Sequence, residues 1–167
     1  EIPHYNPKVM DSWAWSHPYI WEDRLVYPEV MERMRIGYDE REVRIVIPHW
    51  WNGQLVGWQK RALTSDKYPK TPDVVNKDGS TRAPVKYKSS PGLPVNTTLY
   101  NYENLDSTKP VFVVESPMSV LRGLTHGGDF ANVTATFGSG VSDEQLTLLR
   151  KFERIYVASD PDYSGYK

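Results

Sequence analysis

Apolar runs that alternate with helical patterns fill the last third of the chain. A helix is expected from Pro117 to Gly127-Gly128, and the capping box of Ser142 with Gln145 predicts the start of a second helix. The short β-branched run Val111–Val114 before the first helix is typical of a strand that is buried on both faces. The expected strands are Val111–Val114, Asn132–Ala135 and Ile155–Ala158. Strands and helices in this order predict a parallel β-α-β-α-β unit.

A different pattern precedes this unit. Apolar positions at helical spacing predict a helix over Pro28–Ile36, which Gly37 is expected to stop. Glu42–Pro48 and Gln54–Leu63 are expected to pair as antiparallel strands, because Asn52-Gly53 between them is a strong hairpin signal. An antiparallel hairpin belongs to a different architecture from the parallel unit.

The two patterns together predict an α/β fold made of two domains. We expect residues 1–108 to form an α+β subdomain that contains the antiparallel hairpin. Residues 109–167 are expected to form a Rossmann-like parallel unit. The boundary is placed near Ser107–Lys109, where one architecture gives way to the other.

The composition is that of an ordinary globular protein. Of its 167 residues, 39% are hydrophobic and 25% are charged, and the net charge is −1. The absence of cysteine excludes disulfides and Cys-based zinc ribbons within this chain. The sequence contains no leader pattern and no apolar run of membrane length, so we expect a cytoplasmic protein without a membrane partner.

Aromatic residues are concentrated near the start of the chain and show no clear period. We expect Trp13, Trp15, Tyr19 and Trp21 to pack as a cap over the first domain, because large aromatic side chains bury much apolar area. An exposed aromatic patch, for a partner or for base stacking, is the alternative.

The segment from Lys60 to Lys88 is basic. It holds eight lysines and arginines against three aspartates, a local charge of +5, and it contains Tyr68 and Tyr87. Cations that follow phosphates, together with rings that stack on bases, are typical of surfaces that bind single-stranded nucleic acid. A solvated, partly disordered loop over residues 66–83 is the alternative interpretation.

Three carboxylates follow the strands of the predicted parallel unit. Glu115 comes directly after the first strand, and Asp160 and Asp162 follow the third. Because the carboxyl ends of parallel strands meet at one edge of a sheet, we expect the three side chains to converge. Their mutual repulsion would raise at least one pKa unless a cation neutralised them, which favours Mg²⁺ or Mn²⁺. Helix caps or solvated loop charges are the alternative interpretation.

These motifs resemble a known domain. A strand that ends in Glu115, a glycine loop at Gly138 and the motif Asp160-x-Asp162-x-x-Gly165 are similar to the TOPRIM domain shared by DnaG-type primases, topoisomerases and some nucleases. The separation of 45 residues between Glu115 and Asp160 suits that pattern. A haloacid-dehalogenase-type loop or a sugar-nucleotide metal motif could also contain the two aspartates. The former expects most of its domain after the motif, whereas this chain ends shortly afterwards.

The first half of the chain narrows the resemblance to DNA primases. The order of its motifs is similar to that of the subdomain before TOPRIM in that family, and the resemblance covers about residues 22–167. The motifs are Ile36-Gly37-Tyr38, Ile47-Pro48, Asn52-Gly53, Val56-Gly57 followed by Arg61, Lys86-Tyr87, Ser90-Pro91 and Leu99-Tyr100. The resemblance implies that Arg61, Lys86 and Tyr87 contact nucleotides or template DNA.

Charge and position add Arg44, Lys60 and Lys88 to these expected contacts. The chain also departs from the family pattern. Ser119 stands where the family often has Asp, and Ser89 stands where it has Asn. The sequence ends before the helix and acidic strand that complete a TOPRIM domain, so we expect that domain to be truncated.

The resemblance implies the catalytic core of a bacterial or bacteriophage DnaG-type primase. Such a core synthesises short RNA primers from NTPs on single-stranded DNA by metal-dependent nucleotidyl transfer. Glu115, Asp160 and Asp162 would bind the metal and act in catalysis, with Glu115 as a ligand or a general base. A zinc-binding template-recognition module on another domain or chain and a replicative helicase are the expected partners. A TOPRIM nuclease or other strand-cleaving enzyme and a non-catalytic nucleic-acid-binding accessory module are the alternatives.

Overall fold

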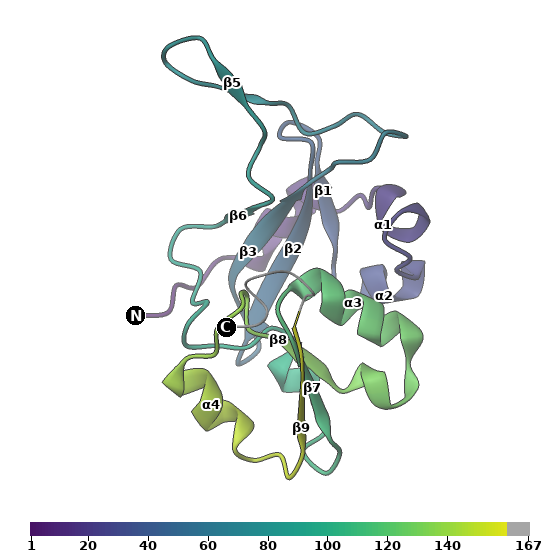
Figure 1. The fold of residues 1–167 in the computed structure, drawn as a ribbon, viewed down its shortest axis with the longest axis vertical. Coiled ribbons are helices and arrows are strands. Elements are labelled where there is room, and N and C mark those ends of the chain that lie inside the picture. The colour runs from purple at the N-terminus through teal and green to yellow at the C-terminus, as the bar shows by residue number, and fades with distance from the viewer. Residues whose placement is uncertain (160–167) are drawn as a thin grey trace.

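The computed structural model describes residues 1–159, which form two main sheets (Figure 1). The strands of the first sheet are β1 Gly37–Asp39, β2 Arg44–Trp51, β3 Gln54–Ala62 and β6 Tyr87–Ser89. This sheet is antiparallel, with the order β1-β2-β3-β6. The strands of the second sheet are β7 Val111–Val114, β8 Val133–Ala135 and β9 Ile155–Ala158. It is parallel, with the order β8-β7-β9, and the mixed arrangement confirms the predicted α/β class.

Short helices join these strands. The α-helices are α1 Tyr19–Glu22, α2 Pro28–Arg33, α3 Pro117–His126 and α4 Asp143–Leu149. The 3₁₀ helices are η1 Pro7–Trp13, η2 Tyr102–Asn104 and η3 Gly128–Ala131. No helix within residues 1–159 has the length and apolar character needed to cross a membrane.

The predicted hairpin of β2 and β3 is present. Asn52 and Gly53 have φ angles of 50° and 71°, and positive φ at both central residues is what a type I′ turn requires. The expected strand end at Pro48 is wrong, because the pairing continues to Trp51 opposite Gln54. The hairpin therefore forms the long centre of the antiparallel sheet.

Gly37 has a different role from the one predicted. Helix α2 ends at Arg33, and the left-handed residue after it is Arg35, with φ of 56°. Gly37 instead begins β1, where an added Cβ would lie 1.8 Å from the carbonyl oxygen of Trp13. Glycine is needed here because η1 lies directly against the strand.

The parallel unit follows the predicted order. Ser116 caps α3, and Ser142 forms the expected capping box with Gln145 at the start of α4. Strands β7 and β9 have the predicted bounds, while β8 begins one residue later. Strand β7, which was expected to be buried on both faces, buries Val111 and Val113 fully and Phe112 and Val114 partly. Strand β9 is an edge strand whose residues Ile155–Ala158 are all exposed.

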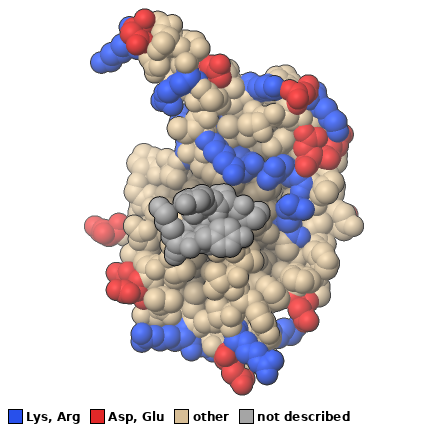
Figure 2. All heavy atoms as spheres, in the orientation of Figure 1, with Lys and Arg blue, Asp and Glu red and all other residues tan. Residues whose placement is uncertain are grey.

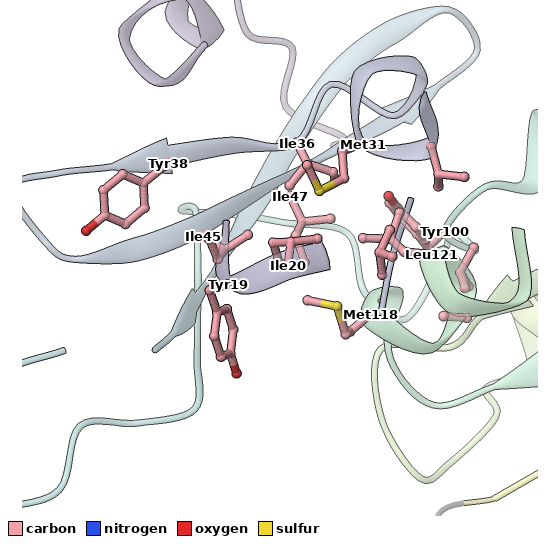
Figure 3. Packing of buried hydrophobic residues seen from close by; sticks show 14 of the residues in the cluster. Tyr19, Ile20, Met31, Ile36, Tyr38, Ile45, Ile47, Tyr100, Met118 and Leu121 are labelled. Atoms are coloured by element: carbon pink, nitrogen blue, oxygen red, sulfur yellow. The ribbon is translucent and has the colours of Figure 1, made fainter. Parts of the chain in front are cut away.

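One hydrophobic core joins the two sheets (Figure 3). Met118 and Leu121 of α3 are buried in the same cluster as Ile20, Met31 and Ile47 of the first half. A backbone bridge between Tyr100 and Ala135 adds a second link. The division into residues 1–108 and 109–167 stays a prediction, and the packing across this boundary is continuous.

The N-terminal aromatic residues divide into two groups. Tyr19 is buried, and Trp13 packs against Trp58 with 5.1 Å between ring centroids, as the cap prediction requires. The prediction is wrong for Trp15 and Trp21, which are 56% and 37% exposed. Both line a hollow of about 640 Å³ between η1 and α2.

The basic segment contains a hairpin instead of an irregular loop. Strands β4 Val74–Val75 and β5 Thr81–Arg82 pair with each other and with no other strand of the described residues. Figure 1 shows this hairpin standing clear of the body of the molecule.

Truncation of α3 in the shared core tests its contribution to stability. We expect Leu121→Ala to lower the free energy of unfolding by about 2–5 kcal/mol, because Leu121 is fully buried and its loss leaves a cavity. Urea unfolding followed by circular dichroism measures the change. Leu146→Ala in α4 is the control, since Leu146 is 47% exposed and its truncation should cost less than about 0.5 kcal/mol. Equal losses in the two variants would contradict the assignment of α3 to the core.

Candidate nucleic-acid and metal site

Glu115 lies at the carboxyl edge of the parallel sheet. It follows β7 directly, and Val114 is paired with Ala135 of β8 and with Ala158 of β9. All three strands therefore end at the same level beside the half-buried Glu115. The other two predicted carboxylates, Asp160 and Asp162, lie outside the described residues.

The donor chemistry at this edge fits a hard divalent cation. Glu115 supplies carboxylate oxygens, the ligands that Mg²⁺ and Mn²⁺ prefer. Within residues 1–159 no group of three or more acidic or histidine side chains is close enough to hold a metal ion. A set completed by the aspartates after β9 stays a prediction of the sequence.

The loop after β8 is fixed beside Glu115. The Thr136 N–H donates to the carbonyl oxygen of Val114 at 3.1 Å, and the Gln145 side-chain amide donates to the Thr136 carbonyl at 3.2 Å. Phe137 has a positive φ of 66° and packs edge-on against His49, with 4.9 Å between ring centroids. The loop is therefore held by side chains from two other elements.

His49 is a structural group in this arrangement. Its Nε2 lies 2.8 Å from the Thr98 hydroxyl, and burial lowers the pKa of its imidazole to about 3. The ring is consequently neutral at physiological pH. It supports Phe137 and does not supply a positive charge to the site.

Three of the predicted nucleic-acid contacts are close together on the antiparallel sheet. Arg61 of β3 is paired with Tyr87 of β6, and its Nη1 donates to the Tyr87 hydroxyl at 2.7 Å. The Arg61 guanidinium carbon lies 5.3 Å from the centroid of that ring, and the Lys86 ammonium lies 6.0 Å from it. A buried Arg61 thus holds Tyr87 in a fixed orientation.

Arg24, which the sequence analysis missed, lies near Arg61 and near a further missed arginine, Arg122. The pKa of Arg24 is lowered by burial and then by the positive charges of Arg61 and Arg122. None of these three guanidinium groups forms an ion pair with a carboxylate in the described part of the chain. Guanidinium groups without a protein counter-ion are suited to bind an anion, and their planar shape matches phosphate. Figure 2 shows Lys and Arg side chains gathered on this face.

No local motif in the sequence marks Arg24 or Arg122. Arg24 follows α1, Arg61 lies in β3 and Arg122 lies in α3, so only the tertiary fold brings them together. Helix α3 also connects this cluster to the carboxylate edge, because it begins two residues after Glu115 and carries Arg122.

The remaining predicted contacts have structural partners. Lys60 Nζ lies 2.6 Å from Asp39 and 2.8 Å from Glu42, and Lys88 also pairs with Glu42. The buried Arg44 donates from Nη1 to the backbone oxygens of Lys60 and Val85, at 3.2 and 3.0 Å. Their role in nucleic-acid binding stays a prediction, and in the structure they connect separate segments of the antiparallel sheet.

The Lys60 ion pairs shift the pKa values of all three partners. Burial alone would raise the pKa of Asp39, but hydrogen bonds from Lys60 and from the backbone lower it below its ordinary value. Hydrogen bonds from Lys60 and Lys88 lower the pKa of Glu42. Burial opposes the charged form of Lys60, yet its two carboxylate partners raise its pKa. The folded state therefore favours the charged form of each group.

Comparison with known proteins gives relatives of one kind. No family model matches the chain. Among curated proteins, the DNA primase of Staphylococcus aureus strain COL is 28% identical over 137 residues, which cover 77% of this chain and 20% of the relative. The DNA primase of strain MRSA252 gives the same values. The matched region thus spans about a fifth of the length of these relatives.

Solved structures agree. The Aquifex aeolicus primase, comprising zinc-binding and RNA polymerase domains, has a TM-score of 0.64 and 20% identity and covers 87% of this chain and 42% of its own. The DnaG catalytic core has a TM-score of 0.60 and 17% identity, and the match covers 87% of this chain and 55% of that structure's chain. The fold is that of a DnaG-type primase catalytic core. The primase fragment of the bacteriophage T7 primase-helicase shares this fold, with a TM-score of 0.61 and 15% identity. That match covers 99% of this chain and 66% of the T7 chain. The predicted resemblance to the DnaG-type core is confirmed.

The pH dependence of stability tests the Lys60 ion pairs. Because the pKa values of Asp39 and Glu42 are lowered by folding, their contribution is present above about pH 4 and is lost as the pH falls through the folded-state values. We expect Lys60→Met to cost roughly 3 kcal/mol of unfolding free energy near pH 7, because it leaves Asp39 buried without its partner.

This cost should shrink as the pH is lowered from about 7 to about 3, as measured by urea unfolding at each pH. Lys70→Met is the matched control. Its partner Asp66 is highly exposed, so we expect little change at any pH. A cost for Lys60→Met that is independent of pH in this range would contradict the ion-pair assignment.

Proposed function

We propose that this chain is the catalytic core of a DNA primase, which synthesises short RNA primers from NTPs on a single-stranded DNA template. The observation that carries the proposal is the arginine cluster of Arg24, Arg61 and Arg122, connected through α3 to Glu115 on a primase-core fold. Arginines near a carboxylate suit a nucleotide, because the arginines can bind its phosphates and the carboxylate can bind the cation that accompanies them.

The reaction joins two nucleotides. The 3′-oxygen of one attacks the α-phosphorus of the other, the bond to the pyrophosphate leaving group breaks, and the hydroxyl proton is released. The arginine cluster would hold the phosphates in line with the attacking oxygen and offset their negative charge. Tyr87, fixed by its hydrogen bond to Arg61, would present its ring to a base.

Glu115 is proposed to act on the other side of the reacting phosphate. It would orient the 3′-hydroxyl, either by accepting its proton or by helping to hold a divalent ion together with Asp160 and Asp162. When bound, Mg²⁺ or Mn²⁺ would stabilise the charge on the phosphoryl oxygens and favour ionisation of the hydroxyl.

Partners are proposed from the solved relatives. The Aquifex protein contains a zinc-binding domain, and the T7 fragment belongs to a primase-helicase. We accordingly propose a zinc-binding module that recognises the template and a replicative helicase that delivers it, together with a cytoplasmic location where the template and NTPs are found. A TOPRIM nuclease has less support, because the solved relatives named above are primases.

Primer synthesis tests the proposal directly. We expect the wild-type chain to make short oligoribonucleotides from labelled NTPs on single-stranded DNA with Mg²⁺ or Mn²⁺. Glu115→Gln and Asp160→Asn should each lower the rate at least about a hundredfold, because each removes a charge that acts on the reacting phosphate. Restoration of part of the Glu115→Gln activity by excess Mn²⁺ would assign Glu115 as a ligand, and a changed pH profile would assign it as a base.

Glu144→Gln, an exposed substitution in the first turn of α4, is the control and should leave the rate unchanged. Circular dichroism checks that all variants fold. Cleavage of the template in place of synthesis would favour the TOPRIM nuclease, and DNA binding without either activity would favour the accessory module.

Nucleotide binding tests the arginine cluster. We expect Arg24→Ala and Arg61→Ala each to weaken binding of an NTP about tenfold or more, because a charge-assisted hydrogen bond to phosphate contributes about 1.5–3 kcal/mol. Isothermal titration calorimetry with a non-hydrolysable NTP measures the affinity. Arg150→Ala, at the exposed end of α4, removes the same charge elsewhere and should have no effect. Equal losses in all three variants would show that only net charge matters.

A further inference from the structure

An excursion of the chain separates β3 from β6, although these two strands pair directly. Arg61 of β3 lies opposite Tyr87 of β6, so the sheet itself does not need the residues between them. Residues 64–86, which we call the arm, leave the sheet, form the β4–β5 hairpin and return to β6 (Figure 1). The arm therefore begins and ends beside the proposed phosphate site.

The base of the arm is fixed to the sheet. The Thr71 hydroxyl accepts from the Leu63 N–H at 2.8 Å and donates to the Val43 carbonyl at 2.6 Å, and Thr71 is buried. On the returning side, the Val85 carbonyl accepts from the Arg44 guanidinium at 3.0 Å. Both ends of the arm are therefore anchored, and its direction is set by the body of the protein.

The tip of the arm is ordered by its own hydrogen bonds. Val74 is paired with Arg82, and the turn between the strands is closed by Asn76, whose side-chain amide donates to the Ser80 hydroxyl at 2.9 Å. Asp78 accepts from the Ser80 N–H at 3.0 Å. Side-chain hydrogen bonds thus fix the shape of this turn. A loop that only connects two strands does not need them.

The surface of the arm suits a partner with regularly spaced negative charges. Val75 is 70% exposed, and an isolated two-stranded hairpin is only marginally stable in water. Lys77, Arg82 and Lys86 form no ion pair with any residue of the described chain. Asp78 is already occupied in the turn. Unpaired cations thus extend from the tip to the base, where Lys86 precedes Tyr87.

We propose that the arm is a clamp for the backbone of the single-stranded template, which Lys77 and Arg82 contact through its phosphates outside the catalytic site. This inference rests on the proposed primase function. The nine residue-to-residue steps from Lys77 to Lys86 reach at most roughly 30 Å when extended, the length of about nine stacked nucleotides. The clamp therefore acts on long templates and not on a strand that only fills the site.

Binding of short and long DNA tests this clamp. The arm variant combines Lys77→Ser with Arg82→Ser, and the control combines Lys109→Ser with Arg154→Ser, which removes the same charge from exposed positions away from the arm. Fluorescence anisotropy with labelled strands of about 6 and about 24 nucleotides gives the affinities over a range of salt concentrations.

We expect the arm variant to bind the long strand about tenfold more weakly and the short strand as the wild type does. The slope of log K against log salt for the long strand should fall by about 1.4, because each phosphate contact on a single strand contributes about 0.7. The control should match the wild type on both strands. Since all four side chains are exposed, unchanged urea midpoints are expected.

If the arm variant binds the long strand with the affinity and salt slope of the wild type, the clamp is overturned. It is also overturned if the arm variant loses as much affinity for the short strand as for the long one, or if the control variant loses as much affinity as the arm variant. Replacement of residues 73–83 by a short Gly-Ser linker gives a second variant with the same expected result. Length-dependent binding through the arm without any primer synthesis would support the clamp and reject the proposed reaction. A wild-type chain that binds neither strand would reject both.

Discussion

The packing of α3 against the first half of the chain is the constraint on which the rest of the structure depends. Met118 and Leu121 are buried with Ile20 and Ile47, so one close-packed core holds both sheets. The same helix begins two residues after Glu115 and carries Arg122. Any change in its depth or rotation would therefore move the carboxylate edge relative to the arginine cluster. The contacts that stabilise the fold also set the geometry of the proposed reaction.

The protein uses its cations in two distinct ways. Lys60 has two carboxylate partners, and its ion pairs tie β3 to Asp39 at the end of β1 and to Glu42 in the turn between β1 and β2. Arg24 and Arg61 have no such partner in the described chain, and their mutual repulsion together with burial lowers the pKa of Arg24. This repulsion costs stability in the free protein, and the phosphate of the proposed function would relieve it. Stability is thus reduced at the proposed anion site, and such a cost is common at functional sites.

The sequence predicted what is encoded locally. The turn at Asn52-Gly53, the capping box at Ser142 and the strand Val111–Val114 all depend on neighbouring residues, and all were predicted correctly. The burial of Trp15 and Trp21 was predicted wrongly, because it depends on which elements cover their side chains. The arginine cluster was missed for a similar reason, since its members come from three elements far apart in the sequence. Arg61 was predicted only because the family resemblance marked its position.

Backbone strain explains why the surroundings of the site were the hardest part to predict. Leu25, next to Arg24, and Phe137, close to Glu115, both have positive φ angles, which cost a residue other than glycine about 1–2 kcal/mol. The turn at Leu25 is maintained because the following Val26 is fully buried, and Phe137 is held by its packing against His49. Neither conformation is favoured by the local sequence, so each depends on the completed core. Loosening the core should consequently release these two segments first, and with them the positions of Arg24 and of the loop beside Glu115.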